Sequence, residues 1–210
     1  MEEEINYELR ITNYKLEIST VIIILISPKA NNFITINQKL MIKRIAITGP
    51  ESTGKSRLAE ELAMHYKTIW VAEYAREYLE IINRPYNYDD ILQIAKGQLD
   101  RENAAVEKAK NCMFCDTDFT VTKIWCEFKY NQCHDWINEQ FLYHQYDLYL
   151  LCDTDIPWAF DPQRENPNER EELFQIYQQI LKDAKFPFAI VTGIGDLRLK
   201  NTIKFIDKIL

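Results

Sequence analysis

The segment with the clearest chemical pattern in this sequence is residues 49–56, which read Gly-Pro-Glu-Ser-Thr-Gly-Lys-Ser. They match Gly-x-x-x-x-Gly-Lys-Ser/Thr, in which the glycines let the backbone curl until consecutive N–H groups point at an anion. We expect Lys55 to reach the β- and γ-phosphates of a nucleoside triphosphate and the Ser56 hydroxyl to hold Mg²⁺. The predicted nucleotide contacts are Gly49, Pro50, Glu51, Ser52, Thr53, Gly54, Lys55, Ser56 and Arg57.

The residues on either side of this loop provide the context that the pattern requires. A short apolar run, residues 45–47, follows two cations and predicts a buried strand. After the loop, apolar residues recur at helical spacing at Leu58, Ala59, Leu62 and Ala63. The N-terminus of such a helix adds partial positive charge where phosphates bind. A strand, a glycine loop and a helix in this order seldom arise together by chance, so the sequence predicts that the chain binds ATP.

Short apolar segments alternate with helical ones along the rest of the chain. Strands are predicted at about residues 43–48, 68–71, 113–116, 148–151 and 188–191. Helices are predicted at about residues 55–66, 72–82, 120–130, 136–143 and 169–184, with a long helix capped by Asp89 or Asp90 that runs to about 110, and a final helix that runs to 210. This alternation predicts an α/β P-loop NTPase or kinase fold, a parallel five-stranded sheet with helices on both faces.

Charged residues follow several of these strands, where parallel-sheet proteins bind their ligands. Asp116 ends the third predicted strand, at a position where a carboxylate can hold Mg²⁺ or accept a proton from a hydroxyl. For Asp118 two interpretations stay open, a contact in an acceptor pocket or the N-cap of the following helix. Glu73 and Arg76 follow the second strand and lie one helical turn apart, so both can face the mouth of the site.

A polar loop at residues 153–168 follows the fourth predicted strand. It contains Arg164, and Arg170 comes shortly after it. Arginines opposite a phosphate-binding loop commonly stabilise a phosphoryl group during its transfer, so we expect both to be catalytic. The alternative is a charged loop that is merely solvated.

Three aromatic residues lie near the acid-bearing strand ends, Trp125, Tyr130 and Trp158. An aromatic face beside a phosphate site suits a planar ring, and a cationic ring especially. We therefore predict that they belong to the acceptor pocket, although core packing would explain any one of them taken singly.

The composition narrows the class of protein and its partners. A net charge of −7 argues against nucleic acid, whose phosphates need a basic face. The apolar run at residues 21–26 is too short to span a bilayer, so no membrane partner is expected. Cys112 and Cys115 are predicted to point to opposite faces of one strand, and the remaining cysteines form no second pair with zinc-binding spacing. Buried thiols in a reducing cytoplasm are the expectation.

The first 40 residues differ from the rest. Residues 5–11 are followed at once by a near-copy at 12–18, with Asn-Tyr-x-Leu-x-Ile in both. Two such units are too few for a coiled coil. We interpret residues 1–40 as an N-terminal extension, a translated upstream repeat with synthesis naturally starting at Met41, and residues 41–210 as the P-loop kinase domain. The alternative is a genuine extra helix or edge strand.

Taken together, several segments resemble the nicotinamide-riboside kinase domain of the NadR type, a P-loop small-molecule kinase. The likeness extends over residues 41–210. The segments that carry it are residues 49–56, Trp-Val-Ala-Glu-Tyr-Ala-Arg-Glu at 70–77, Asp116-Thr117-Asp118 with Thr122 and Trp125, and residues 155–164. The glycine loop is common to many NTPases, whereas the Glu-Tyr-Ala-Arg and Pro-Trp segments in this order are more specific.

The resemblance implies ATP and Mg²⁺ as cofactors, nicotinamide riboside as the acceptor, and nicotinamide mononucleotide and ADP as products. Its best-known members also carry DNA-binding and adenylyltransferase domains, which 40 residues cannot hold, so only the kinase step is implied. The expected catalytic residues are Lys55, Asp116, Arg164 and Arg170, with Ser56 and Asp116 at the metal. The expected acceptor pocket is Glu73, Arg76, Asp118, Trp125, Tyr130 and Trp158.

Two departures from the family pattern stand out. Ala72 replaces the proline expected before Glu73, and Pro162 replaces a glycine in the polar loop, which can stiffen it. Two other functions stay open: another P-loop nucleoside or small-molecule kinase, and an ATP-binding regulatory module without acceptor chemistry. The acid at Asp116 and the arginine-bearing loop argue against the second, because a passive binder needs neither.

If residues 1–40 take no part in the fold, a chain comprising residues 41–210 should keep full activity and lose little thermal stability. The measurement is a comparison of kinase activity and melting temperature between this shortened chain and the full one. A fall of many degrees on removing the first 40 residues would show that they pack on the domain.

Overall fold

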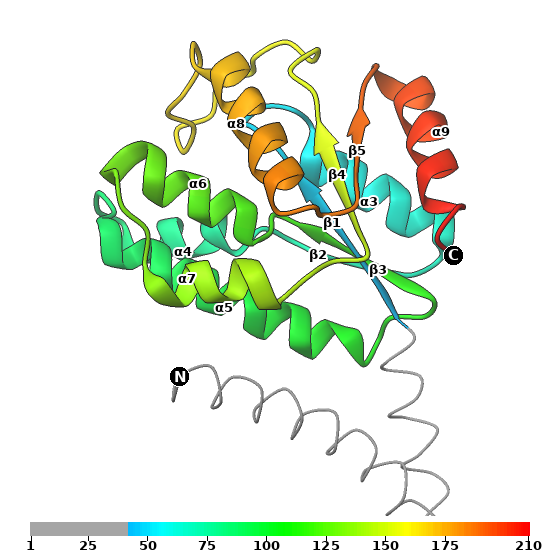
Figure 1. Cartoon of the computed structure of the whole chain (residues 1–210), viewed down its shortest axis with the longest axis horizontal. Helices are drawn as coiled ribbons and strands as arrows, with labels where there is room; N and C mark the ends of the chain where they lie inside the picture. The colour runs from blue at the N-terminus through cyan, green and yellow to red at the C-terminus, as the bar shows by residue number, and fades with distance from the viewer. Residues whose placement is uncertain (1–41) are drawn as a thin grey trace, which may run out of the picture. The chain divides into compact units, whose positions relative to one another are not determined.

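A computed structural model of the chain describes residues 42–210, and the duplicated segment and the boundary predicted at Met41 lie outside the described residues. Five parallel strands form one sheet in the order β2-β3-β1-β4-β5 (Figure 1). Their bounds are β1 (Lys43–Thr48), β2 (Ile69–Val71), β3 (Cys112–Asp116), β4 (Leu148–Cys152) and β5 (Phe188–Val191). The predicted parallel five-stranded sheet is confirmed.

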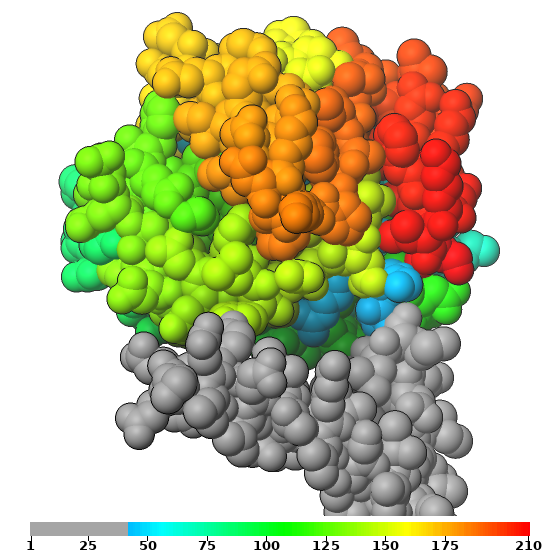
Figure 2. All heavy atoms as spheres, viewed as in Figure 1, coloured from blue at the N-terminus to red at the C-terminus, as the bar shows by residue number. Residues whose placement is uncertain are grey.

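Helices cover both faces of this sheet. Their bounds are α3 (Lys55–Tyr66), α4 (Tyr74–Ile82), α5 (Tyr88–Val106), α6 (Phe119–Tyr130), α7 (Asp135–Tyr143), α8 (Arg170–Asp183) and α9 (Gly195–Ile206). Residues of α3 and α9 pack on one face, and residues of α5, α6, α7 and α8 pack on the other. In the space-filling view, side chains of α6, α7 and α8 close over the second face (Figure 2).

The central strands are buried on both sides, which explains their continuous apolar runs. In β3 the side chains alternate between the two faces, so Cys112 and Phe114 join the α3 and α9 side whereas Met113 and Cys115 join the other. The prediction that Cys112 and Cys115 point to opposite faces is confirmed. Among residues 42–210, none of the helices has the length and apolar character needed to cross a membrane.

Element boundaries differ from the predictions mainly where side chains cap a helix. The long helix α5 is capped by Asn87, not by Asp89 or Asp90, because the Asn87 side chain accepts from the backbone N–H groups of both. Asp90 returns a bond to the Asn87 N–H, which completes a capping box. The helix ends at Val106, short of the predicted residue 110.

The register of the strands places three chain segments at one edge of the sheet. Ile47 in β1 pairs with Asp116 in β3, and Thr48 pairs with Leu151 in β4. The glycine loop, residues 117–118 and the loop at 153–168 therefore all begin at the same carboxyl edge. This is the geometry that the predicted site requires.

Candidate functional site

Two glycines shape the loop between β1 and α3. Gly49 has φ +124°, and a Cβ atom there would lie 2.8 Å from the carbonyl oxygen of Cys152, so only glycine fits beside β4. Gly54 has φ +75° and stands at the N-cap of α3, where no side chain caps the helix. The first N–H groups of α3 are left for an anion, as the sequence predicts.

Lys55 lies folded back over this loop. Its ammonium donates to the carbonyl oxygens of Gly49 at 2.9 Å and Pro50 at 2.8 Å. Within the loop, the Thr53 hydroxyl also donates to the Pro50 carbonyl at 2.8 Å. These bonds hold the loop in its curled shape with a cation beside it, ready to meet a negatively charged group.

Asp116 is buried at the end of β3 with one carboxylate oxygen that has no hydrogen-bond partner among the described residues. Burial, and then the nearby Glu73 carboxylate, raise the pKa of Asp116 to about 6, while a hydrogen bond with Ser56 and the charge of Lys55 act in the opposite direction. A buried carboxylate oxygen beside a hydroxyl is a donor set that suits Mg²⁺. The residues present therefore fit the predicted metal.

A residue that the sequence analysis missed holds Glu73 beside Asp116. Gln98 of α5 is buried, and its amide oxygen accepts from the Tyr74 N–H at 2.8 Å while its amide nitrogen donates to the Asp116 carbonyl at 3.5 Å. Glu73 precedes α4 directly, so the start of this helix is tied to the end of β3. In the sequence, the one signal for Gln98 is its helical spacing from Ile94 and Ala95, which places it on the apolar face of α5.

Asp118 does not lie in the acceptor pocket, where it was predicted. Its side chain is buried and accepts from the Thr48 hydroxyl at 2.8 Å, the Thr120 hydroxyl at 2.6 Å, and the backbone N–H groups of Thr120 and Val121. The structure therefore supports the N-cap interpretation. Asp118 ties the start of α6 to the end of β1, and it does not line the cavity described below.

The side chains of two glycine-loop residues, at positions that the motif leaves free, bind the loop at residues 153–168. One oxygen of the Glu51 side chain accepts from the N–H groups of Glu165 and Asn166, both at 3.0 Å. The Ser52 hydroxyl accepts from the Ala159 N–H at 2.8 Å. The side chains of these two residues thus hold the long loop close to the phosphate-binding backbone.

The two predicted catalytic arginines have different positions. Arg164 lines the cavity, and its guanidinium contacts the Ser52 hydroxyl and the Ala159 carbonyl. Arg170 does not line it. Its guanidinium donates to the carbonyls of Glu51, Ser52, Thr154 and Ile156, which joins the glycine loop to the long loop. Arg170 therefore has the contacts of a residue that orders the two loops.

One cavity of about 540 Å³ joins these elements. Residues 49–57 line it together with Glu73, Arg76, Trp125 and Arg164, so the predicted nucleotide contacts share one space with three of the six predicted acceptor residues. Tyr130 and Trp158 lie outside it: Tyr130 packs against Tyr88, and Trp158 lies under the Arg170 guanidinium at 6.0 Å. Of the three predicted aromatics, only Trp125 lines the cavity.

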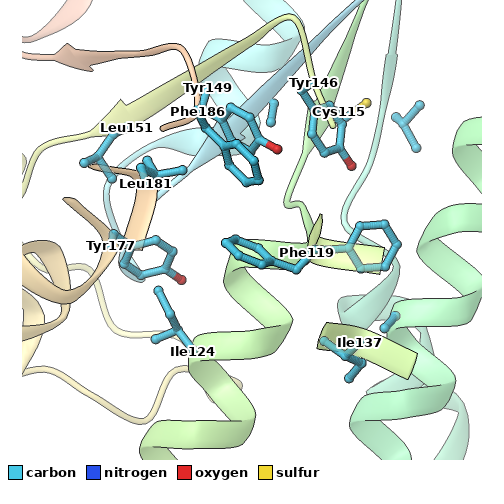
Figure 3. Packing of buried hydrophobic residues seen from close by; sticks show 14 of the residues in the cluster. Cys115, Phe119, Ile124, Ile137, Tyr146, Tyr149, Leu151, Tyr177, Leu181 and Phe186 are labelled. Carbon is cyan, nitrogen blue, oxygen red and sulfur yellow. The ribbon is translucent and has the colours of Figure 1, made fainter. Parts of the chain in front are cut away.

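Tyr177 of α8 lines the cavity and is a second residue that the sequence analysis missed. Only 4% of it is exposed, and among the described residues its hydroxyl has no hydrogen-bond partner. Figure 3 shows the ring directed from α8 toward Ile124 of α6. Burial raises the pKa of Tyr177 well above its ordinary value, so the hydroxyl stays protonated and can donate to a ligand. In the sequence it is one apolar-face position of an amphipathic helix, which predicts packing alone.

The glycine loop at the carboxyl edge of this parallel sheet defines a P-loop NTPase. A family model described as an AAA domain matches residues 44–198, well over half of the chain, and the chain belongs to this family. Two curated relatives are each 29% identical, the trifunctional NAD biosynthesis/regulator protein NadR of Escherichia coli (strain K12) over 159 residues and that of Salmonella typhimurium (strain LT2) over 156 residues. Each match covers 71% of this chain and 38% of the relative, so the chain spans well under half the length of these proteins.

Solved structures show the same fold. A NadR protein in complex with NR superposes with a TM-score of 0.72 at 22% identity, covering 83% of this chain and 52% of that one. A deoxyadenosine kinase from M. mycoides gives a TM-score of 0.55 at 13% identity, covering 79% of this chain and 99% of that one. At such low identities these likenesses establish the P-loop fold that nucleoside and nucleotide kinases share.

The raised pKa of Asp116 makes a prediction about stability. Because its pKa in the folded chain is about 6 against an ordinary 3.8, folding favours the protonated acid, and stability is lost as the pH rises from about 4 to 6. Asp116→Asn stays neutral and should raise the free energy of unfolding above pH 6 by up to about 3 kcal/mol, with no gain below pH 4. Urea unfolding at pH 4 and pH 7.5 measures this difference.

The matched control is Asp90→Asn. The hydrogen bond from Arg84 lowers the pKa of Asp90, so this carboxylate stabilises the fold once it is ionised. Its replacement should reduce stability at pH 7.5, the opposite sign from Asp116→Asn. A loss of stability at pH 7.5 in both variants would contradict the electrostatic account of Asp116.

Proposed function

We propose that this chain is an ATP-dependent kinase that phosphorylates a hydroxyl of nicotinamide riboside, giving nicotinamide mononucleotide in NAD salvage. The observation that carries the proposal is the single cavity lined by the phosphate-binding loop, Glu73 and Trp125. The similarity to NadR proteins, one of them in complex with NR, supports the acceptor. Because the chain spans 38% of those relatives, the proposal is limited to phosphoryl transfer.

The P-loop is the proposed binding site for the nucleotide. The N–H groups at the start of α3 would bind the β-phosphate, and Lys55 would exchange its loop carbonyls for phosphate oxygens. As the γ-phosphoryl group leaves ADP, negative charge grows on its oxygens, and a cation held at that place lowers the barrier. Arg164, which lines the same cavity, would provide a second positive charge.

Ser56 and Asp116 are the proposed ligands of the metal ion. Mg²⁺, when bound, neutralises charge between the β- and γ-phosphates. The Ser56 hydroxyl and the unpartnered oxygen of Asp116 would hold it, directly or through water. Burial raises the pKa of Asp116, and a bound cation would lower it again and so favour the ionised form that this role needs.

Glu73 and Trp125 are the proposed binding residues for the acceptor. Glu73 lines the cavity near Asp116, and it is the carboxylate that we propose accepts the proton of the attacking hydroxyl. The face of Trp125 would bind the cationic pyridinium ring, and the Tyr177 hydroxyl would donate to a polar group on it. Arg76, whose guanidinium donates to Asp161 at 2.9 Å, would fix the long loop beside the acceptor.

A different nucleoside as acceptor is the main alternative, because deoxyadenosine and thymidylate kinases share the fold. A non-catalytic nucleotide-binding module has less support, since it would have no use for an unpartnered carboxylate beside the P-loop. We assign the activity to residues 41–210. The cytoplasm is the proposed location, which the free cysteines favour.

Lys55→Ala should reduce kcat by about 10²–10³-fold, because the lost charge acts mainly in the transition state. Far-UV circular dichroism should stay unchanged, since the side chain only contacts loop carbonyls. Steady-state kinetics with coupled ADP detection measures the effect. Lys204→Ala, which removes an exposed lysine of α9, is the control and should keep wild-type rates. Full turnover in a folded Lys55→Ala protein would refute the assignment.

Acceptor choice tests the substrate. A desolvated cation–π contact contributes about 2 kcal/mol, so nicotinamide riboside should exceed its reduced, uncharged form by at least about tenfold in kcat/KM. Adenosine and uridine should be poorer still. The measurement is product formation by mass spectrometry across this panel. Trp125→Phe should keep part of the preference because a face remains, whereas Trp125→Leu should abolish it. Equal or better use of adenosine or uridine would favour the general nucleoside kinase.

A further inference from the structure

Trp125 is held by a group of three polar side chains: Tyr86, Glu165 of the long loop, and Lys129 of its own helix α6. Its indole N–H donates to the Tyr86 hydroxyl at 2.9 Å, and the edge of one ring meets the face of the other at 73° with 5.0 Å between centroids. Tyr86 belongs to the turn between α4 and α5 and does not line the cavity. The orientation of the cavity's aromatic face thus depends on a residue behind it.

Tyr86 is in turn bonded to the long loop. Its hydroxyl donates to the Glu165 carboxylate. Lys129 of α6 donates to both Glu165 oxygens, at 3.0 and 2.8 Å, and its ammonium lies 4.0 Å from the centre of the Tyr86 ring. Three side chains therefore converge on one phenol: Trp125 and Lys129 of α6 donate to its hydroxyl, and Glu165 of the long loop accepts from it.

The backbone N–H of Glu165 also forms one of the hydrogen bonds between the long loop and the P-loop. Its N–H donates to the Glu51 side chain at 3.0 Å. A continuous path of hydrogen bonds thus runs from the phosphate-binding loop through Glu165 and Tyr86 to the indole of Trp125. Glu165 belongs to the loop at 153–168 and lines the cavity, so this path joins that loop to the Trp125 ring.

We propose that Tyr86 is a positioning residue for the acceptor, and that Glu165 makes the placement of the Trp125 ring depend on the position of the loop at 153–168. This inference rests on the proposed function, since the ring it orients is the proposed acceptor surface. Ordering the ring before binding removes part of the entropy lost when the acceptor enters. The assembly therefore tunes acceptor affinity more than the rate of phosphoryl transfer.

The Lys129–Glu165 ion pair contributes little to the stability of the fold, which suits a role in positioning the ring. The side chains of Lys129 and Glu165 are 36% and 44% exposed, and ion pairs at that exposure contribute little to stability. Their attraction is also screened by salt. Removing one hydroxyl from this group should therefore leave the fold intact, which makes the variant Tyr86→Phe a direct test.

Tyr86→Phe removes the one hydrogen bond that orients the Trp125 indole, so it should raise the KM for nicotinamide riboside about three- to tenfold, with kcat and the KM for ATP within about twofold of wild type. Tyr88→Phe removes a hydroxyl two residues along the chain, outside this group, and should leave all three constants unchanged. Glu165→Gln should resemble Tyr86→Phe. An effect in Glu165→Gln alone would mean that Glu165, which lines the cavity, contacts the acceptor itself, and would overturn the positioning role.

A second readout does not depend on activity. The indole N–H signal of Trp125 in a ¹H–¹⁵N spectrum can be assigned among the four tryptophans by its loss in Trp125→Phe. We expect it to shift in both Tyr86→Phe and Glu165→Gln without ligand, and not in Tyr88→Phe. If wild type fails to phosphorylate the riboside, the proposed function is wrong. If wild type is active and neither the signal nor the KM moves in Tyr86→Phe, the positioning role is wrong.

Discussion

A carboxylate buried at the carboxyl edge of the sheet is the constraint around which this site is built. Asp116 has one oxygen without a partner among the described residues, and a buried acceptor left in that condition lowers stability. The next residue, Thr117, has φ +82°, a strained value for a β-branched side chain. Burial and strain together keep an acidic oxygen beside Ser56 and Lys55, where a cation and a phosphate can satisfy it. Part of the fold's stability is therefore given up to prepare the site.

The P-loop has two separate roles, one for its backbone and one for its side chains. The backbone, shaped by Gly49 and Gly54, forms the curled loop ahead of α3. The side chains of Glu51 and Ser52 instead fasten the loop at residues 153–168, and Arg170 joins the same two loops through carbonyl oxygens. Because the motif leaves these positions free, a family can vary how the loop is held without disturbing phosphate binding. The position of the long loop and the shape of the nucleotide site are thereby linked.

The acceptor side depends on residues that are far apart in the sequence. Trp125 of α6, Tyr177 of α8 and Glu73 before α4 line one cavity only because their elements cover the same face or edge of the sheet. Solved structures of a NadR protein, a deoxyadenosine kinase and a thymidylate kinase share the fold at low identity, so this assembly of side chains is what can distinguish one ligand from another. The hydrogen bonds behind Trp125 extend that assembly to the long loop.

The amino-acid sequence was enough to predict the P-loop, the five parallel strands and the acid at Asp116, because these depend on local patterns: a glycine motif, continuous apolar runs, and a charge at the end of a strand. It could not decide between N-cap and acceptor pocket for Asp118, because only the structure shows that this side chain accepts from the N–H groups of Thr120 and Val121 and lies outside the cavity. It also could not separate Trp125 from Tyr130 and Trp158, or reveal Gln98 and Tyr177. Which of these side chains face the cavity is set by packing between residues tens of positions apart, and no local pattern records it.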